Sequence, residues 1–132
     1  MILGTMITNS LRRANVIRGN ASADAQQNKD AIRKFNGLMS RLDADGIDIG
    51  DFPVTDISDT LDLEREHEDP VESLFALTLQ VFHGLPIEPG LVAEATGAEK
   101  FLLRNTSSKP VVDLRFAPLG RASRLTSDII NG

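Results

Sequence analysis

Apolar residues near the start of the chain recur at the spacing of one helical face. They are Leu3, Ile7, Leu11 and Ala14, each three or four positions after the last. Positions three and four apart lie on the same side of an α-helix. We therefore predict a first helix over about Thr5 to Ala14, and we expect Asn15 to end it in a left-handed conformation.

A longer amphipathic segment follows. Ser22 is a good N-cap residue and Asp24 then falls in the first turn, so we predict a second helix that begins near Ser22 and ends at Gly46. Its apolar stripe comprises Ala25, Ile32, Phe35, Leu38, Met39 and Leu42. Basic side chains lie mostly on the opposite side. Gly37 falls inside this helix, and we expect it to allow close contact with another helix.

A third helix is predicted from its start signals. Asp69 can serve as the N-cap, Pro70 suits the first helical position, and Glu72 lies in the first turn. The expected inward face consists of Val71, Leu74, Phe75, Thr78, Val81 and Phe82, widened by Leu77 and Leu79. Because this helix is apolar on nearly every side, we place it at the centre of the fold. It is expected to close at residues 83–86.

The last helical pattern runs from about Pro89 to Arg104. Its expected inward residues are Leu91, Val92, Ala95, Ala98, Phe101 and Leu102. The chain is therefore predicted to be mainly α, with four helices in a domain that spans residues 1–105.

Two stretches lack helical periodicity. Residues 47–52 and 60–63 alternate apolar and polar side chains, which indicates short, half-buried extended pieces within a long acidic loop over 47–69, either irregular or a short β-hairpin. Residues 106–132 begin with a linker and then mix apolar and basic residues. They form either a frayed tail or an extended docking arm that orders on a neighbour; the branched and aromatic residues favour the arm.

The composition excludes several kinds of protein. The 132 residues include no Cys, Trp or Tyr, so disulfides, thiolate metal sites and Cys nucleophiles are absent. No apolar run is long enough to span a membrane, and the first residues lack the basic start of a signal peptide. We expect a protein that is made and kept in a cytoplasm and has no membrane partner.

Charge divides the chain into three segments. Residues 1–42 carry seven basic and two acidic residues, residues 43–99 carry one basic and fifteen acidic residues, and residues 100–132 carry six basic and two acidic residues. Folding can mix these segments into an even surface. The alternative is a polar subunit whose oppositely charged faces meet in an oligomer or against a partner.

Candidate chemistry is sparse. The Asp-Ala-Asp-Gly run at 43–46 does not match the register of a calcium loop and is better explained as a helix end. The acids over 56–69 could supply ligands for a hard cation, but a solvated loop is the simpler interpretation, and His67 has no second His at metal-binding spacing. Phosphate-binding and nucleophile motifs are missing, so we predict no enzyme, no catalytic residue, no metal and no cofactor. The alternative function is a small helical regulator that binds nucleic acid through the basic second helix and the basic tail, although no aromatic stacking platform is present.

The order of these features resembles a known family. A short helix runs into Arg-Arg-Ala-Asn-Val-Ile (12–17), and a longer one ends in Leu-Met-Ser-Arg-Leu-Asp-Ala-Asp-Gly-Ile (38–47). The acidic loop carries Phe-Pro-Val-Thr-Asp (52–56) and Asp-Thr-Leu-Asp-Leu (59–63), and the helix pair runs from Glu-Ser-Leu-Phe-Ala-Leu (72–77) to Ala-Glu-Ala (93–95). Over about residues 1–105 the succession is similar to the head-to-tail adaptor (head-completion, or packaged-DNA-stabilising) proteins of tailed bacteriophages. The chain departs from many relatives in having no Trp or Tyr near the turn at 45–46 and in being short after the fourth helix.

That resemblance implies a virion structural protein, assembled in the host cytoplasm. Such subunits form a homo-oligomeric ring, typically twelvefold, below the portal protein, where the ring extends the channel for double-stranded DNA, helps retain the genome and receives tail or nozzle proteins. The C-terminal segment would grip the portal through Val111, Leu114, Arg115, Phe116, Leu119, Arg121 and Arg124. The acidic loop would contact a neighbouring subunit or line the channel through Asp56, Asp59, Asp62, Glu64, Glu66 and Glu68. Basic residues of the second helix, Arg33, Lys34 and Arg41, would meet that loop between subunits.

Overall fold

Four helices make up most of the chain that the computed structural model describes, namely residues 1–50 and 53–106. They are α1 (Leu3–Arg13), α2 (Ala25–Ala44), α3 (Arg65–Phe82) and α4 (Pro89–Thr106). These residues contain no strand, so the mainly α prediction is confirmed and the β-hairpin is not formed there. None of the described helices is long and apolar enough to cross a membrane.

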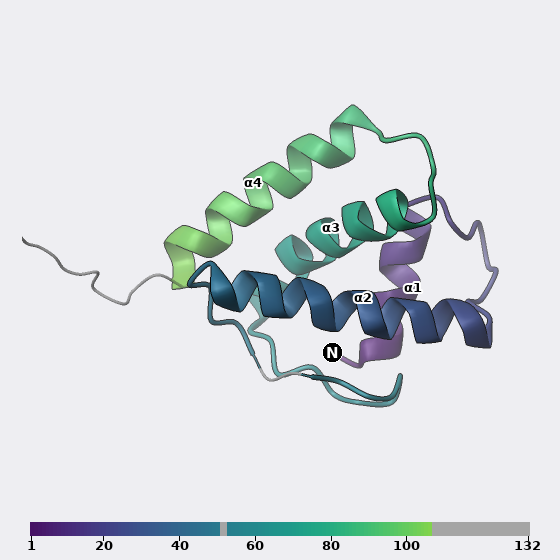
Figure 1. Cartoon of the computed structure of the whole chain (residues 1–132), viewed down its shortest axis with the longest axis horizontal. Coiled ribbons are helices and arrows are strands. Elements are labelled where there is room, and N and C mark those ends of the chain that lie inside the picture. Colours follow the sequence, from purple (N-terminus) through teal and green to yellow (C-terminus); the bar gives the residue numbers. More distant parts are fainter. Residues whose placement is uncertain (51–52, 107–132) are drawn as a thin grey trace, which may run out of the picture.

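Helix α3 lies at the centre, as its all-round apolar pattern predicted. It packs against α4 along its length and against α1 and α2 on its other sides (Figure 1). The Phe75 ring on α3 meets the Phe35 ring on α2 edge to face, with ring centroids 5.2 Å apart. Both side chains are essentially fully buried, which contributes about 1.5–3 kcal/mol each to folding.

One buried polar side chain completes this centre. Gln80 is fully buried, and its Nε2 donates to the carbonyl of Ala14 at 3.3 Å while its Oε1 accepts from the backbone N–H of Glu88 at 3.2 Å. The amide thus supplies partners to backbone groups at the end of α1 and just before α4. A buried polar group is tolerated when its hydrogen bonds are made in this way.

The start of α2 differs slightly from the prediction. Asp24, rather than Ser22, is the N-cap: its carboxylate accepts from the N–H of Gln27 at 2.7 Å, and the Gln27 side chain accepts from the N–H of Asp24 at 3.0 Å. This reciprocal pair satisfies two backbone donors at once, which a cap by Ser22 would not. The expected ends are confirmed, because Asn15 has a φ of 65° and Gly46 a φ of 87°.

The predicted start of α3 is wrong. The helix begins at Arg65, five residues before Pro70, and Glu64 precedes it as N-cap without a side-chain hydrogen bond. A proline disrupts a helix by removing one N–H bond and crowding the carbonyl four residues earlier. Here that carbonyl belongs to Glu66 in the exposed first turn, where water can serve it. The expected inward face is also wrong at its end, since Val81 is 56% and Phe82 37% exposed. In α4, Val92 is likewise 37% exposed.

The connection between α2 and α3 is extended but not a sheet. Ile47, Ile49 and Leu61 are buried while their polar neighbours face solvent, as the alternation predicted. The single isolated bridge of the described chain pairs Ile2 with Thr60. Gly50 approaches the other extended piece so closely that a Cβ there would lie 2.9 Å from the carbonyl oxygen of Asp62.

Candidate functional site

A groove with basic walls lies between α2 and α3. It is lined by Arg33, Lys34, Gly37, Leu38, Arg41 and Thr78 and has a volume of about 420 Å³. We call it the α2–α3 groove. Gly37 does not mediate a close helix contact, contrary to expectation, because a Cβ at this position would meet nothing within 4 Å. The missing side chain instead leaves the groove open.

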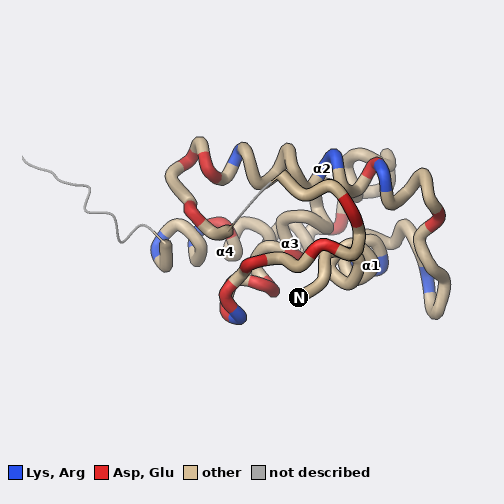
Figure 2. The backbone as a smooth tube through the Cα atoms, turned by 90° about the horizontal axis from the view of Figure 1, so that it is seen from below, with Lys and Arg blue, Asp and Glu red and all other residues tan. Residues whose placement is uncertain are grey.

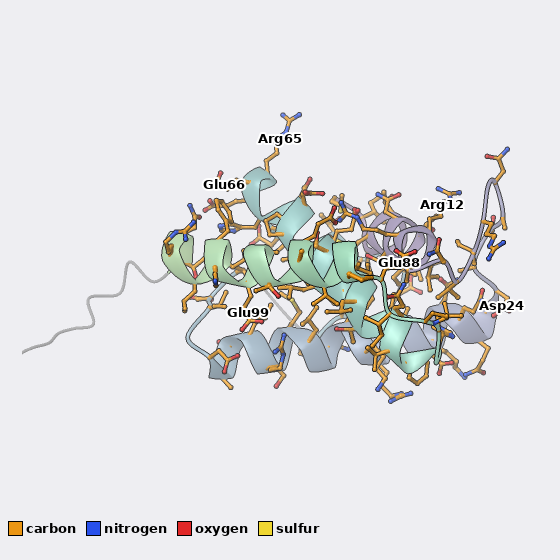
Figure 3. The ribbon with its side chains drawn as sticks, turned by 90° about the horizontal axis from the view of Figure 1, so that it is seen from above. Arg12, Asp24, Arg65, Glu66, Glu88 and Glu99 are labelled. Atoms are coloured by element: carbon orange, nitrogen blue, oxygen red, sulfur yellow. The ribbon has the colours of Figure 1, made fainter. Side chains whose placement is uncertain are left out.

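Each of the three cations of this groove contacts a neighbouring side chain. Arg33 lies 3.9 Å from the Asp30 carboxylate, and Arg41 lies 3.6 Å from Glu99 of α4, on the side of that helix facing α2 (Figure 3). Lys34 Nζ and Arg33 Cζ lie 4.7 and 5.5 Å from the centroid of the Phe82 ring. Cation–π contact explains how Phe82 remains at the surface, since its ring is partly covered by two charged side chains. The exposed pairs are worth little to stability, so these cations stay available to an outside anion.

Acidic residues follow the chain from the end of α2 into the first turns of α3 (Figure 2). The structure divides the six predicted acids of this region into three groups. Asp56 and Asp59 shape their own turn: an Asp59 oxygen accepts from the N–H groups of Thr55 and Asp56 at 2.9 and 3.1 Å. The hydroxyl and backbone N–H of Ser58 donate to Asp56, which lowers the pKa of that carboxyl.

The second group surrounds a recess. Asp62 and Glu64 line it together with Asp48, Ile49, Gly50 and His67, and its volume is about 240 Å³. Glu66 lies in the first turn of α3, two residues after Glu64, and its carboxylate comes close to Glu64 and His67. We call Asp48, Asp62, Glu64 and Glu66 the acidic edge. Glu68, the last of the six acids, turns elsewhere, to lie 3.9 Å from the N-terminal amine.

His67 was not recognised as part of a cluster from the sequence. Its side chain is only 5% exposed, and Nε2 lies 2.7 Å from Oδ1 of Asn105 at the end of α4. A lone histidine in an acidic stretch gives no local sign of burial, because the residue that orients it is 38 positions away. His67 belongs to α3 because the helix starts at Arg65, five residues before Pro70, where the start was predicted.

A second charged cluster, also missed, joins three helices. Arg13 of α1 lies 3.3 Å from Glu72 and 3.5 Å from Asp69 on α3, and 3.7 Å from Glu94 on α4, and it donates to the Ser73 hydroxyl at 2.9 Å. Burial raises the pKa of Glu72, Arg13 acts in the opposite direction, and the charge of Asp69 adds to the rise. This cluster connects α1 to α3 and α4 at one side of the helices.

The predicted portal contacts cannot be placed. Val111, Leu114, Arg115, Phe116, Leu119, Arg121 and Arg124 all lie outside the described residues, as does the rest of the segment 107–132. The segment follows the last turn of α4, where Asn105 contacts His67 beside the acidic edge.

Comparisons with known proteins supply no family. The chain matches no protein-family model, and a search of curated proteins returns no significant relative.

Proposed function

We propose that this protein is a head-to-tail adaptor of a tailed bacteriophage. In this proposal the subunits form a homo-oligomeric ring, of the twelvefold kind typical of such adaptors, between the portal and the tail or nozzle proteins. The ring extends the channel for double-stranded DNA and helps to retain the packaged genome in the virion. The chain is a structural subunit rather than an enzyme.

The assignment to a phage adaptor rests on the sequence resemblance over about residues 1–105. The observation that supports the ring contact is the presence of two oppositely charged surfaces with no residue in common. The α2–α3 groove presents Arg33, Lys34 and Arg41, and the acidic edge presents carboxylates from the α2–α3 connection and the start of α3. A ring joins one surface of each subunit to a different surface of the next. Complementary charge also guides such a contact and disfavours the wrong orientation.

The C-terminal segment supplies the second contact of the proposed adaptor. It continues from α4 next to the acidic edge, so a segment that reaches the portal would leave the subunit on that side. Its basic and apolar residues, from Val111 to Arg124, grip the portal in this proposal. Asp56 is exposed, and in this proposal it repels DNA phosphates from the wall of the channel.

A charge-reversal experiment tests the ring contact. We expect the Arg33→Glu/Lys34→Glu variant of the groove and the Asp48→Lys/Asp62→Lys variant of the acidic edge each to lose ring assembly on the portal protein encoded in the same genome. When the two variants are mixed, the groove of one variant is again complementary in charge to the edge of the other. Rings in which the two variants alternate should therefore assemble and be seen in sedimentation and negative-stain images. The matched control is Arg18→Glu/Lys29→Glu, which reverses two exposed charges outside the groove. Normal rings from both groove and edge variants would refute the proposed contact.

A truncation and a salt titration separate this function from nucleic-acid regulation. The chain ending at residue 106 should stay folded but fail to bind portal rings; normal portal binding by it would defeat the arm assignment. A regulator that binds DNA through α2 and the tail would bind duplex DNA with an affinity that falls steeply with salt. We expect no such saturable binding.

A further inference from the structure

We propose that the first turn of α3 binds a divalent transition-metal ion such as Zn²⁺ through Glu64, Glu66 and His67. One ligand atom from each of these three side chains lies within 4.8 Å of the other two. Two carboxylates and one imidazole around a common point are a ligand set suited to Zn²⁺ or Mn²⁺. The inference does not depend on the adaptor function.

The imidazole of His67 is prepared for a metal in a way that an ordinary surface histidine is not. It is 95% buried by the fold, and the Asn105 oxygen lies 2.7 Å from Nε2. An amide oxygen only accepts hydrogen bonds, so Nε2 is the donor in this contact, and in the neutral imidazole Nδ1 is then the nitrogen with the lone pair. Metal-binding histidines are commonly oriented in this manner, by a hydrogen bond from the other ring nitrogen to a protein oxygen.

The surroundings favour a cation. Besides Glu64 and His67, the recess is lined by Asp48 and Asp62, so four carboxylates of the acidic edge gather near the imidazole. The nearest basic residue in the chain, Arg65, is exposed and extends away from the helices (Figure 3). The N-terminal end of a helix disfavours a cation by a fraction of a unit charge. Four formal negative charges outweigh that effect.

Nothing in local helix structure requires the two glutamates. Glu64 precedes α3 without capping it through its side chain, and both Glu64 and Glu66 are exposed. They can therefore adjust by the few tenths of an ångström to about one ångström needed to close the ligand shell at ordinary metal–ligand distances. A bound ion would hold Glu64 against the first turn of α3 and, through His67 and Asn105, would connect that turn to the end of α4.

Titration calorimetry with ZnCl₂ or MnCl₂ on the tag-free full chain tests the site. We expect one ion per chain, with Zn²⁺ bound at least about tenfold more tightly than Ca²⁺, because Ca²⁺ gains nothing from a nitrogen ligand. Glu64→Gln/Glu66→Gln should abolish this binding while circular dichroism remains unchanged. Asn105→Ala removes no ligand and should weaken it roughly 10–100-fold.

The matched control is Asp43→Asn/Asp45→Asn, which lowers the negative charge by the same amount at exposed positions outside the recess. This variant should bind zinc like the natural chain. Equal weakening in both double variants would show that net charge alone attracts the ion and would overturn the site. Zinc binding that survives Glu64→Gln/Glu66→Gln, or the absence of saturable binding to the natural chain, would also overturn it.

Discussion

From Val71 to Gln80, α3 buries seven of ten side chains among three other helices. By contrast, the connection from residue 45 to residue 64 buries four apolar residues in its described part, namely Ile47, Ile49, Val54 and Leu61. The two regions satisfy their backbone differently. The backbone groups of α3 form hydrogen bonds within the helix, but those of the connection depend on distant partners. The Asn36 side chain of α2 bonds to both backbone groups of Val54. Backbone groups of Leu3 and Met1 bond to those of Asp59 and Leu61. A connection without regular structure therefore holds its shape through specific hydrogen bonds to distant side-chain and backbone groups, while a core helix depends on the packing of its side chains.

The largest expected effect is in the core. Phe75→Ala should lower the free energy of unfolding by about 3–5 kcal/mol, because it removes a fully buried ring and its edge-to-face contact with Phe35. Denaturant unfolding followed by circular dichroism measures the loss. Val81→Ala on the same helix is the control and should change stability by less than about 1 kcal/mol, since Val81 is 56% exposed. Similar losses in both would break the distinction between the buried and exposed sides of α3.

A smaller effect is expected in the connection. The Asn36 amide donates to the Val54 carbonyl at 2.9 Å and accepts from the Val54 N–H at 2.8 Å. Asn36→Ala leaves both backbone groups without these partners and should cost about 1–3 kcal/mol. Hydrogen exchange should then show faster exchange at Val54 and its neighbours than in the centre of α3. Asn36→Asp keeps only the acceptor, so its loss of stability should be smaller than that of Asn36→Ala. Unchanged exchange at Val54 would contradict the proposed dependence on Asn36.

The smallest effect concerns Glu72 of α3, where burial raises the pKa above its ordinary value of 4.5. Glu72 then binds its proton more tightly in the folded chain than in the unfolded one. Its contribution is therefore fully present below the ordinary pKa and declines as pH rises through the raised one.

Glu72→Gln removes this titration and supplies the measurement. The stability of the natural chain relative to the variant should fall with pH above 4.5 and level off once Glu72 is ionised in both states. Unfolding curves at several pH values between about 4 and 7 test this sign. A relative stability that rises over that range would mean that the charge of Arg13 dominates burial at Glu72.

The sequence predicted the helices well where the deciding residues are close together in the chain. The ends of α1 and α2 at Asn15 and Gly46, and the burial of Phe35 and Phe75, follow from turn chemistry and helical periodicity. The prediction of where α3 starts was wrong because Pro70 is a strong local signal for a helix start, and the fold overrides it. The helix extends back to Arg65, and this brings His67 against Asn105 of α4.

The candidate sites divide in the same way. The acidic and basic composition of each segment is visible in the chain, so the charged residues of both surfaces were predicted by type. Their partners were not: Arg41 meets Glu99, and Asp62 shares a recess with Asp48 and His67. Residues so far apart come together only through packing.

By itself, the sequence determined four amphipathic helices, a central third helix and a division of charge along the chain, because helical periodicity and net charge are properties of neighbouring residues. The tertiary structure alone decided which charges are paired, that His67 is buried and oriented, and that Gly37 opens a groove rather than closing a contact. Those outcomes depend on the way separate helices pack, and helix packing is set by the whole core.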